Sequence, residues 1–189
     1  MPGVVEPPWR ATADGVLWRS ADGVTSVVFD DAGVTHTSAG GAPERIPWSQ
    51  VTGVALLLPT ATTSGYRVSA VLSRVGPVPF EHAPREVAII VSTARREHAW
   101  DLGRRGRYSW RLAFALGELA DLLAKTGQLS QLARPDLLDR VADEVVPQVP
   151  RRARMLVRAD LLGLDRRLGG HGAYDRQLAA LVGVVPGRS

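Results

Sequence analysis

Short apolar runs separated by glycine-containing turns occupy the first hundred residues, and this pattern constrains the fold more than any other feature. Residues 15–20 and 24–30 are rich in β-branched and aromatic residues, and Asp22-Gly23 lies between them. Asp-Gly between two such runs predicts a β-hairpin, because both turn positions favour positive φ. Asp31-Ala32-Gly33 leads into residues 34–37 and predicts a second hairpin. Two hairpins in series predict an antiparallel meander.

Further short runs continue the strand pattern to about residue 102, at residues 44–48, 51–58, 66–75, 86–92 and 95–102. Strands at this spacing are typical of an all-β barrel or sandwich. The segment 76–84 contains three prolines and cannot be a central strand. Phe80 within this segment either fills one end of the barrel or contacts a ligand.

The apolar period changes to that of a helix after Gly106. Between residues 108 and 125, leucines recur at helical spacing on one side of the segment, at Leu112, Leu116, Leu119 and Leu123. Lys125 lies in the last turn and Gly127 just beyond it, and both are helix stop signals. We therefore expect an amphipathic helix whose apolar stripe packs against the preceding sheet.

The rest of the chain predicts a small helical extension. Pro135 is compatible with the first turn of a helix over residues 135–146, and two further helices are expected over residues 151–168 and 174–182. We expect the boundary between the two parts within residues 127–134. The predicted organisation is therefore a first domain over residues 1–127 and a helical extension over residues 128–189.

Two segments carry a resemblance to a known family. Residues 27–34 read Val-Val-Phe-Asp-Asp-Ala-Gly-Val, and residues 45–54 read Arg-Ile-Pro-Trp-Ser-Gln-Val-Thr-Gly-Val. A strand–turn–strand unit ending in Asp-x-Gly, then an Ile-Pro-Trp segment and a closing helix, resembles the bacterial pleckstrin-homology-like (PH-like) domains. The resemblance covers about residues 10–127. It implies an α+β fold in which an antiparallel barrel or sandwich is capped by the helix over residues 108–125.

The resemblance also implies a binding or scaffolding module that has no chemistry of its own. Members of the family that bind phosphoinositides carry several Lys and Arg around the first hairpin. Here Arg19 is the only cation in that hairpin and Asp22 lies at its tip. A phosphoinositide site is therefore not carried over, because a shared fold does not imply a shared function.

The composition excludes several classes of site. The chain has no cysteine, which excludes disulfides, thiolate metal sites and cysteine nucleophiles. Its four histidines lack metal-binding spacing, and no phosphate-loop, dinucleotide or nucleophile-elbow motif occurs, so we expect no enzyme, metal or cofactor. His98 alternates in phase with Trp100 and Leu102, which predicts a histidine at the edge of the inward face.

The apolar runs are too short to span a bilayer, and the N-terminus lacks the pattern of a secretory signal. These features predict a cytoplasmic protein, with attachment to a membrane surface as the alternative. Charge is distributed unevenly: residues 1–92 carry a net charge of −2 and residues 93–189 one of +6. This asymmetry favours an acidic partner for the second half, whereas a GC-rich coding bias toward Arg is the alternative explanation.

The densest candidate for ligand binding is a basic and aromatic stretch, which we call the arginine stretch. It consists of Arg95, Arg96, Arg104, Arg105, Arg107, Trp110 and Arg111. Arginines beside aromatic rings suit contact with phosphates and stacking of bases, or insertion at a lipid interface. The alternative is that the tryptophans belong to the core and the arginines flank them in water.

The second candidate is the predicted helix over residues 151–168, in which Val157, Leu161 and Leu164 form an apolar edge flanked by arginines. Burial of this edge against the same chain or a second copy is favoured over a bilayer. The sequence thus predicts a non-enzymatic module that acts through protein contacts and self-association as a homo-oligomer. Binding of nucleic acid through the arginine stretch, or of anionic lipid through the 151–168 helix, is the alternative.

Overall fold

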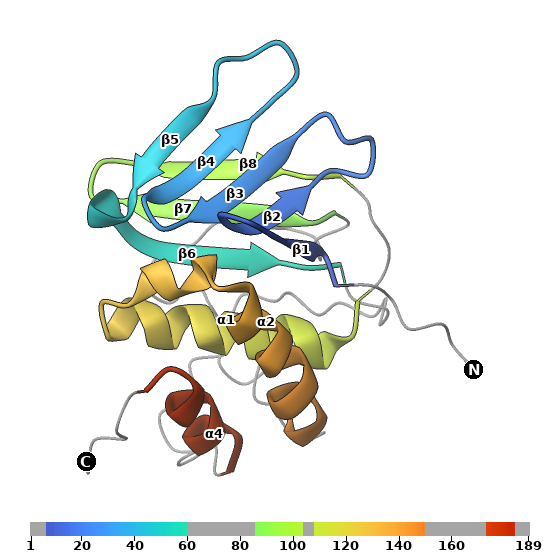
Figure 1. Cartoon of the computed structure of the whole chain (residues 1–189), viewed down its shortest axis with the longest axis vertical. Helices are drawn as coiled ribbons and strands as arrows, with labels where there is room; N and C mark the ends of the chain where they lie inside the picture. Colours follow the sequence, from blue (N-terminus) through green and yellow to red (C-terminus); the bar gives the residue numbers. More distant parts are fainter. Residues whose placement is uncertain (1–6, 60–85, 104–107, 150–172, 184–189) are drawn as a thin grey trace, which may run out of the picture.

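A computed structural model describes residues 7–59, 86–103, 108–149 and 173–183 (Figure 1). Two antiparallel sheets lie next to a group of helices. The strands are β1 (Trp9–Thr12), β2 (Gly15–Arg19), β3 (Ser26–Asp30), β4 (Gly33–Thr37), β5 (Glu44–Pro47), β6 (Val51–Leu57), β7 (Ala88–Thr93) and β8 (Glu97–Asp101).

The first sheet is a meander of five strands in the order β1-β2-β3-β4-β5, which confirms the antiparallel arrangement predicted for residues 15–47. Alternate residues of its strands point into the core, so that Val16, Trp18, Val27 and Phe29 are fully buried. Strand β1 lies outside the strands predicted from the sequence, and it pairs with β2 across the Ala13-Asp14 turn.

The connection between β2 and β3 differs from the two-residue hairpin turn that the sequence predicted. The strands stop pairing at Arg19 and Ser26, so the loop comprises residues 20–25. Its ends are joined by hydrogen bonds of 2.7 and 2.9 Å, one from the Ser20 amide to the Thr25 carbonyl and one from the Thr25 amide to the Ser20 hydroxyl. The second bond, to the Ser20 side chain, replaces a backbone bond that a longer ladder would have made.

The chain leaves the first sheet at Pro47, which has no amide hydrogen to extend a ladder. The single turn η1 (Trp48–Gln50) follows, and the Trp48 indole donates to the carbonyl of Asp30 at 2.7 Å. Strand β6 then begins a second sheet of order β6-β7-β8. The α+β class is therefore confirmed, and the predicted barrel or sandwich is borne out in part: the described residues form two antiparallel sheets but no closed barrel.

Helix α1 (Trp110–Lys125) confirms the helix predicted over residues 108–125. The hydroxyl of Ser109 caps it by accepting hydrogen bonds from the Arg111 and Leu112 amides. The predicted apolar stripe faces the core, because Leu116, Leu119 and Leu123 are fully buried. Helix α1 packs mainly against β6.

The remaining described residues are helical. They form η2 (Leu129–Ala133), α2 (Pro135–Arg140), a π-helical turn (Val141–Val145), η4 (Val146–Gln148) and α4 (Ala173–Leu181). The helices predicted over 135–146 and 174–182 are confirmed, whereas the predicted strand 66–75, loop 76–84 and helix 151–168 lie outside the described residues. In the described part of the chain, no helix is long and apolar enough to cross a membrane.

One apolar cluster extends through both parts of the chain. It includes Trp18 and Phe29 of the first sheet, Leu56 of the second, Leu116 of α1 and Leu138 of α2. The division into residues 1–127 and 128–189 stays a prediction, and the described residues on its two sides contribute to the same core.

Candidate functional site

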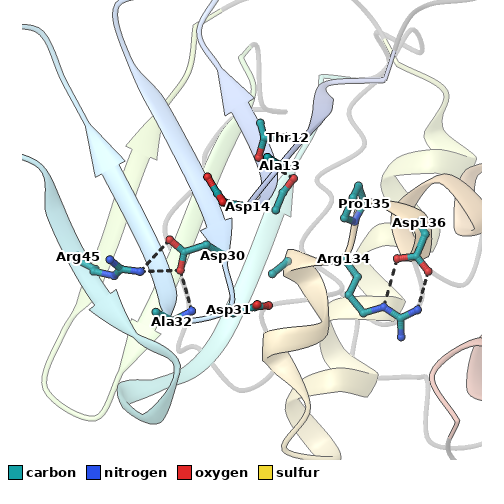
Figure 2. A pocket seen from close by; sticks show the side chains of 12 residues that line it. Thr12, Ala13, Asp14, Asp30, Asp31, Ala32, Arg45, Arg134, Pro135 and Asp136 are labelled. Atoms are coloured by element: carbon teal, nitrogen blue, oxygen red, sulfur yellow. Dashed lines mark hydrogen bonds and ion pairs between the residues drawn. The ribbon is translucent and has the colours of Figure 1, made fainter.

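An open cleft of about 490 Å³ lies where the turns of the five-stranded sheet meet the segment that leads into α2 (Figure 2). We call it the aspartate cleft. It is lined by four segments that are far apart in the sequence, namely Thr12–Gly15, Asp30–Ala32, Arg45 and Ala133–Asp136. Most of these residues are exposed, so the cleft is accessible to a large ligand.

The β3–β4 turn positions one wall of the aspartate cleft. Oδ1 of Asp30 accepts hydrogen bonds from the amides of Ala32 (2.8 Å) and Gly33 (3.0 Å). The guanidinium of Arg45 contacts both oxygens of the same carboxylate, at 2.8 and 2.9 Å. Asp30 and Arg45 therefore neutralise each other, and both act mainly in holding the turn to β5.

The opposite wall carries a second ion pair. Two nitrogens of the Arg134 guanidinium contact the Asp136 carboxylate, at 2.6 and 3.3 Å. The hydrogen bond from Arg134 lowers the pKa of Asp136 below its ordinary value. Pro135 lies in the first turn of α2, where a backbone amide has no partner within the helix, so the missing amide hydrogen of proline costs no hydrogen bond.

The other two carboxylates of the aspartate cleft have no such partner among the residues that the structure describes. Asp14 in the β1–β2 turn and Asp31 in the β3–β4 turn are exposed, and neither has a hydrogen bond or ion pair within the described residues. Figure 2 shows both side chains between the sheet and the Arg134-Pro135 segment. With four aspartates against two arginines, both already paired, the lining carries a net charge of −2.

The structure does not bring together the described members of the arginine stretch. Arg95 and Arg96 lie in the β7–β8 turn, whereas Trp110 and Arg111 follow the far end of β8. Arg104, Arg105 and Arg107 lie outside the described residues. The five residues of β8, which span about 16 Å, lie between the two described groups.

The individual side chains of this stretch are also engaged differently. Arg95 is exposed, but the Arg96 guanidinium contacts Glu44 at 2.8 Å and His98 at 3.1 Å. Arg111 lies over the ring of Trp110, with 5.8 Å between the guanidinium carbon and the ring centroid. Trp110 is half-buried against the core.

The second candidate from the sequence, the apolar edge Val157, Leu161 and Leu164, lies outside the described residues. Within the described ranges, no group of three or more acidic or histidine side chains is arranged to hold a metal ion. Comparison with protein-family models, with curated proteins and with solved structures found no match.

Sequence analysis did not identify the aspartate cleft. One local signal was present, since Asp14-Gly15, at the point where β2 begins, has the same form as Asp22-Gly23. That signal predicts a turn with an exposed aspartate. It does not predict that the segment before α2 lies beside it.

Proposed function

We propose that this chain is a non-enzymatic protein-binding module whose aspartate cleft receives the cationic side chains of a partner protein. The observation that carries the proposal is the pair of exposed carboxylates, Asp14 and Asp31, in a cleft whose two arginines are already paired. The resemblance to PH-like domains supports the same class of function.

The chemistry of the aspartate cleft favours guanidinium or ammonium groups. Charge-assisted hydrogen bonds to carboxylates are about twice as strong as neutral ones, and a guanidinium can contact two carboxylate oxygens at once. Exposed charge pairs contribute mainly to the rate and specificity of association, and salt screens them. We therefore propose a contact that selects a basic partner and weakens with ionic strength.

A second copy of the chain has the required chemistry. Residues 93–189 carry a net charge of +6, and the predicted helix over residues 151–168 contains six arginines. We propose self-association in which the apolar edge Val157, Leu161 and Leu164 contributes affinity. In this proposal the aspartate cleft binds the arginines of the second copy and so orients the two copies.

The proposal is tested with a fluorescent peptide that has the sequence of residues 151–167, titrated with the full chain and followed by anisotropy. Replacing both exposed carboxylates, Asp14→Asn with Asp31→Asn, is expected to weaken binding about tenfold at low salt. The matched control is Glu97→Gln with Asp143→Asn, which removes two exposed charges outside the aspartate cleft and leaves binding unchanged.

Equal weakening in the two variants would show that the peptide follows net charge rather than the cleft, and would refute the proposal. A single-stranded oligonucleotide and anionic vesicles are titrated in parallel. If they bind more tightly than the peptide, and Arg95→Ala with Arg111→Ala abolishes that binding, the arginine stretch is the functional surface instead.

A further inference from the structure

A cluster of ionisable side chains joins β4 and β5 of the five-stranded sheet to β8 of the three-stranded sheet. The imidazole of His36 on β4 stacks on the indole of Trp100 on β8, with ring centroids 5.0 Å apart and an interplanar angle of 10°. His98, also on β8, lies 5.8 Å from the same indole. Trp100 is 7% exposed, so both imidazoles contact a buried ring.

The hydrogen bonds of His98 give its two ring nitrogens different roles. Arg96 Nε lies 3.1 Å from His98 Nε2, and a guanidinium can only donate, so Nε2 is the acceptor and carries no hydrogen. The other ring nitrogen, Nδ1, lies 3.0 Å from Oε1 of Glu44 and donates to it. In this arrangement Nδ1 is the donor and Nε2 is the acceptor.

The charges of this cluster balance only while the imidazoles are neutral. The guanidinium of Arg96 also contacts Oε1 of Glu44, at 2.8 Å, so that one cation faces one anion. Protonation of both histidines would place three cations beside a single carboxylate. Burial lowers the pKa of His36, and the charge of Glu44 opposes that effect.

The neighbouring charged groups do not compensate this excess. Arg45 and Glu97 are adjacent in sequence to Glu44 and His98, but strand alternation places them on the opposite faces of β5 and β8. Arg45 is paired with Asp30. In the described part of the chain, Glu44 and Arg96 are the charged groups at hydrogen-bond or ion-pair distance from the imidazoles.

We propose that His36 and His98 form a proton-sensitive clamp, which holds β4 and β5 against β8 while both imidazoles are neutral and releases them when both are charged. Release follows because protonated Nε2 of His98 cannot accept from Arg96, and because like charges then meet at a half-buried corner. The proposal does not depend on the function proposed for the aspartate cleft.

The test uses the full chain labelled with ¹⁵N. At pH 8, the imidazole nitrogen shifts of His98 are expected to report the tautomer protonated at Nδ1. Between pH 8 and pH 5, the hydrogen-exchange protection factors of β5 and β8, corrected for intrinsic rates, are expected to fall about tenfold relative to those of β2 and β3.

The variant His36→Gln with His98→Asn removes the titration, while Asn keeps a donor near the position of Nδ1. Its protection factors in β5 and β8 are expected to change by less than about twofold over the same range. Glu97→Gln, on the opposite face of β8, serves as the matched control and is expected to behave as the wild type.

Three results would overturn the clamp. One is a His98 tautomer protonated at Nε2 at pH 8. Another is an equal loss of protection in all strands, which would indicate global destabilisation. The third is constant protection in β5 and β8 of the wild type while both imidazoles gain charge. This result needs no variant, so it remains decisive if the double variant does not fold.

Discussion

The indole Nε1 of Trp9 donates a hydrogen bond to Oδ1 of Asp139, 3.0 Å away and 130 positions further along the chain. Trp9 is 4% exposed and lies in the first strand, whereas Asp139 is exposed on α2. The bond thus links the edge of the five-stranded sheet to the C-terminal helices. It also lies next to the segment that forms one wall of the aspartate cleft.

This link predicts an energetic coupling between the two residues. In a double-mutant cycle, Trp9→Phe keeps most of the ring and removes the donor, and Asp139→Ala removes the acceptor. We expect a coupling free energy of about 0.5–1.5 kcal/mol in urea unfolding, the net value of a typical hydrogen bond. The same cycle with Asp143→Ala, one turn further along the chain, should be additive within about 0.5 kcal/mol. Additivity at Asp139 as well would contradict the link.

The buried face of α1 gives a second prediction. Leu116 is fully buried in the shared core, so Leu116→Ala should lower the free energy of unfolding by about 2–5 kcal/mol. Arg111 is half-buried and lies over the Trp110 ring, so Arg111→Ala should cost no more than about 1 kcal/mol. Chemical denaturation measures both, and equal costs would mean that the apolar stripe of α1 does not face the core.

The first position of β2, beside the aspartate cleft, requires a glycine. Gly15 has φ +150°, and a Cβ at this position would overlap the carbonyl oxygen of Phe29. Gly15→Ala should therefore destabilise the chain by about 3 kcal/mol or more, because both the backbone and β3 must shift. Gly40 has φ +67° with open space around it, so Gly40→Ala should cost only about 1–2 kcal/mol. A similar cost at the two positions, in thermal or chemical unfolding, would argue against the close approach at Gly15.

Self-association gives a fourth prediction, which concerns the predicted helix over residues 151–168. Leu161→Asp places a charge in the apolar edge and is expected to convert an oligomer into a monomer in size-exclusion light scattering. Arg151→Ala with Arg152→Ala should leave the oligomer intact at high salt, because those arginines face outward in the predicted helix. If the arginine variant dissociates and Leu161→Asp does not, association is electrostatic rather than apolar.

The parts of the fold that follow from short-range chemistry were predictable. The turn residues around Gly33 and the leucine spacing of α1 each act within a few positions, and both predictions are confirmed. The longer β2–β3 loop was not predicted, because the bonds of Ser20 with Thr25 compete with a tight Asp-Gly turn.

The candidate site depends on distances that sequence spacing does not give. Arg96 and Arg111 are close in sequence, but the extended strand β8 separates them, and Arg96 turns back to Glu44 on another sheet. Asp14 and Arg134 are 120 positions apart, yet both line the aspartate cleft. A charge count along the chain therefore emphasised the arginine stretch and missed the acidic cleft.

Stability should depend on pH through His36. Burial lowers the pKa of this histidine in the folded state, so between that value and its ordinary value near 6.5 the unfolded chain binds more protons. Above about pH 6.5, His36 is neutral in both states and does not lower the free energy of unfolding. As the pH falls below that value, the free energy of unfolding should decrease until the folded-state pKa has been passed. The ion-paired carboxylates Asp136 and Glu144 also have lowered pKa values, but their contribution is lost only below about pH 4.5.

Urea unfolding of the wild type and of His36→Gln at a series of pH values separates the two contributions. The variant should lose the part of the decline below about pH 6.5 that His36 contributes, and it should keep the decline below about pH 4.5, since its carboxylates are unchanged. Equal stability of the wild type at pH 7.5 and pH 5 would show that the pKa of His36 is not lowered in the folded chain. The stacked contact with Trp100 would then make no difference to its charge.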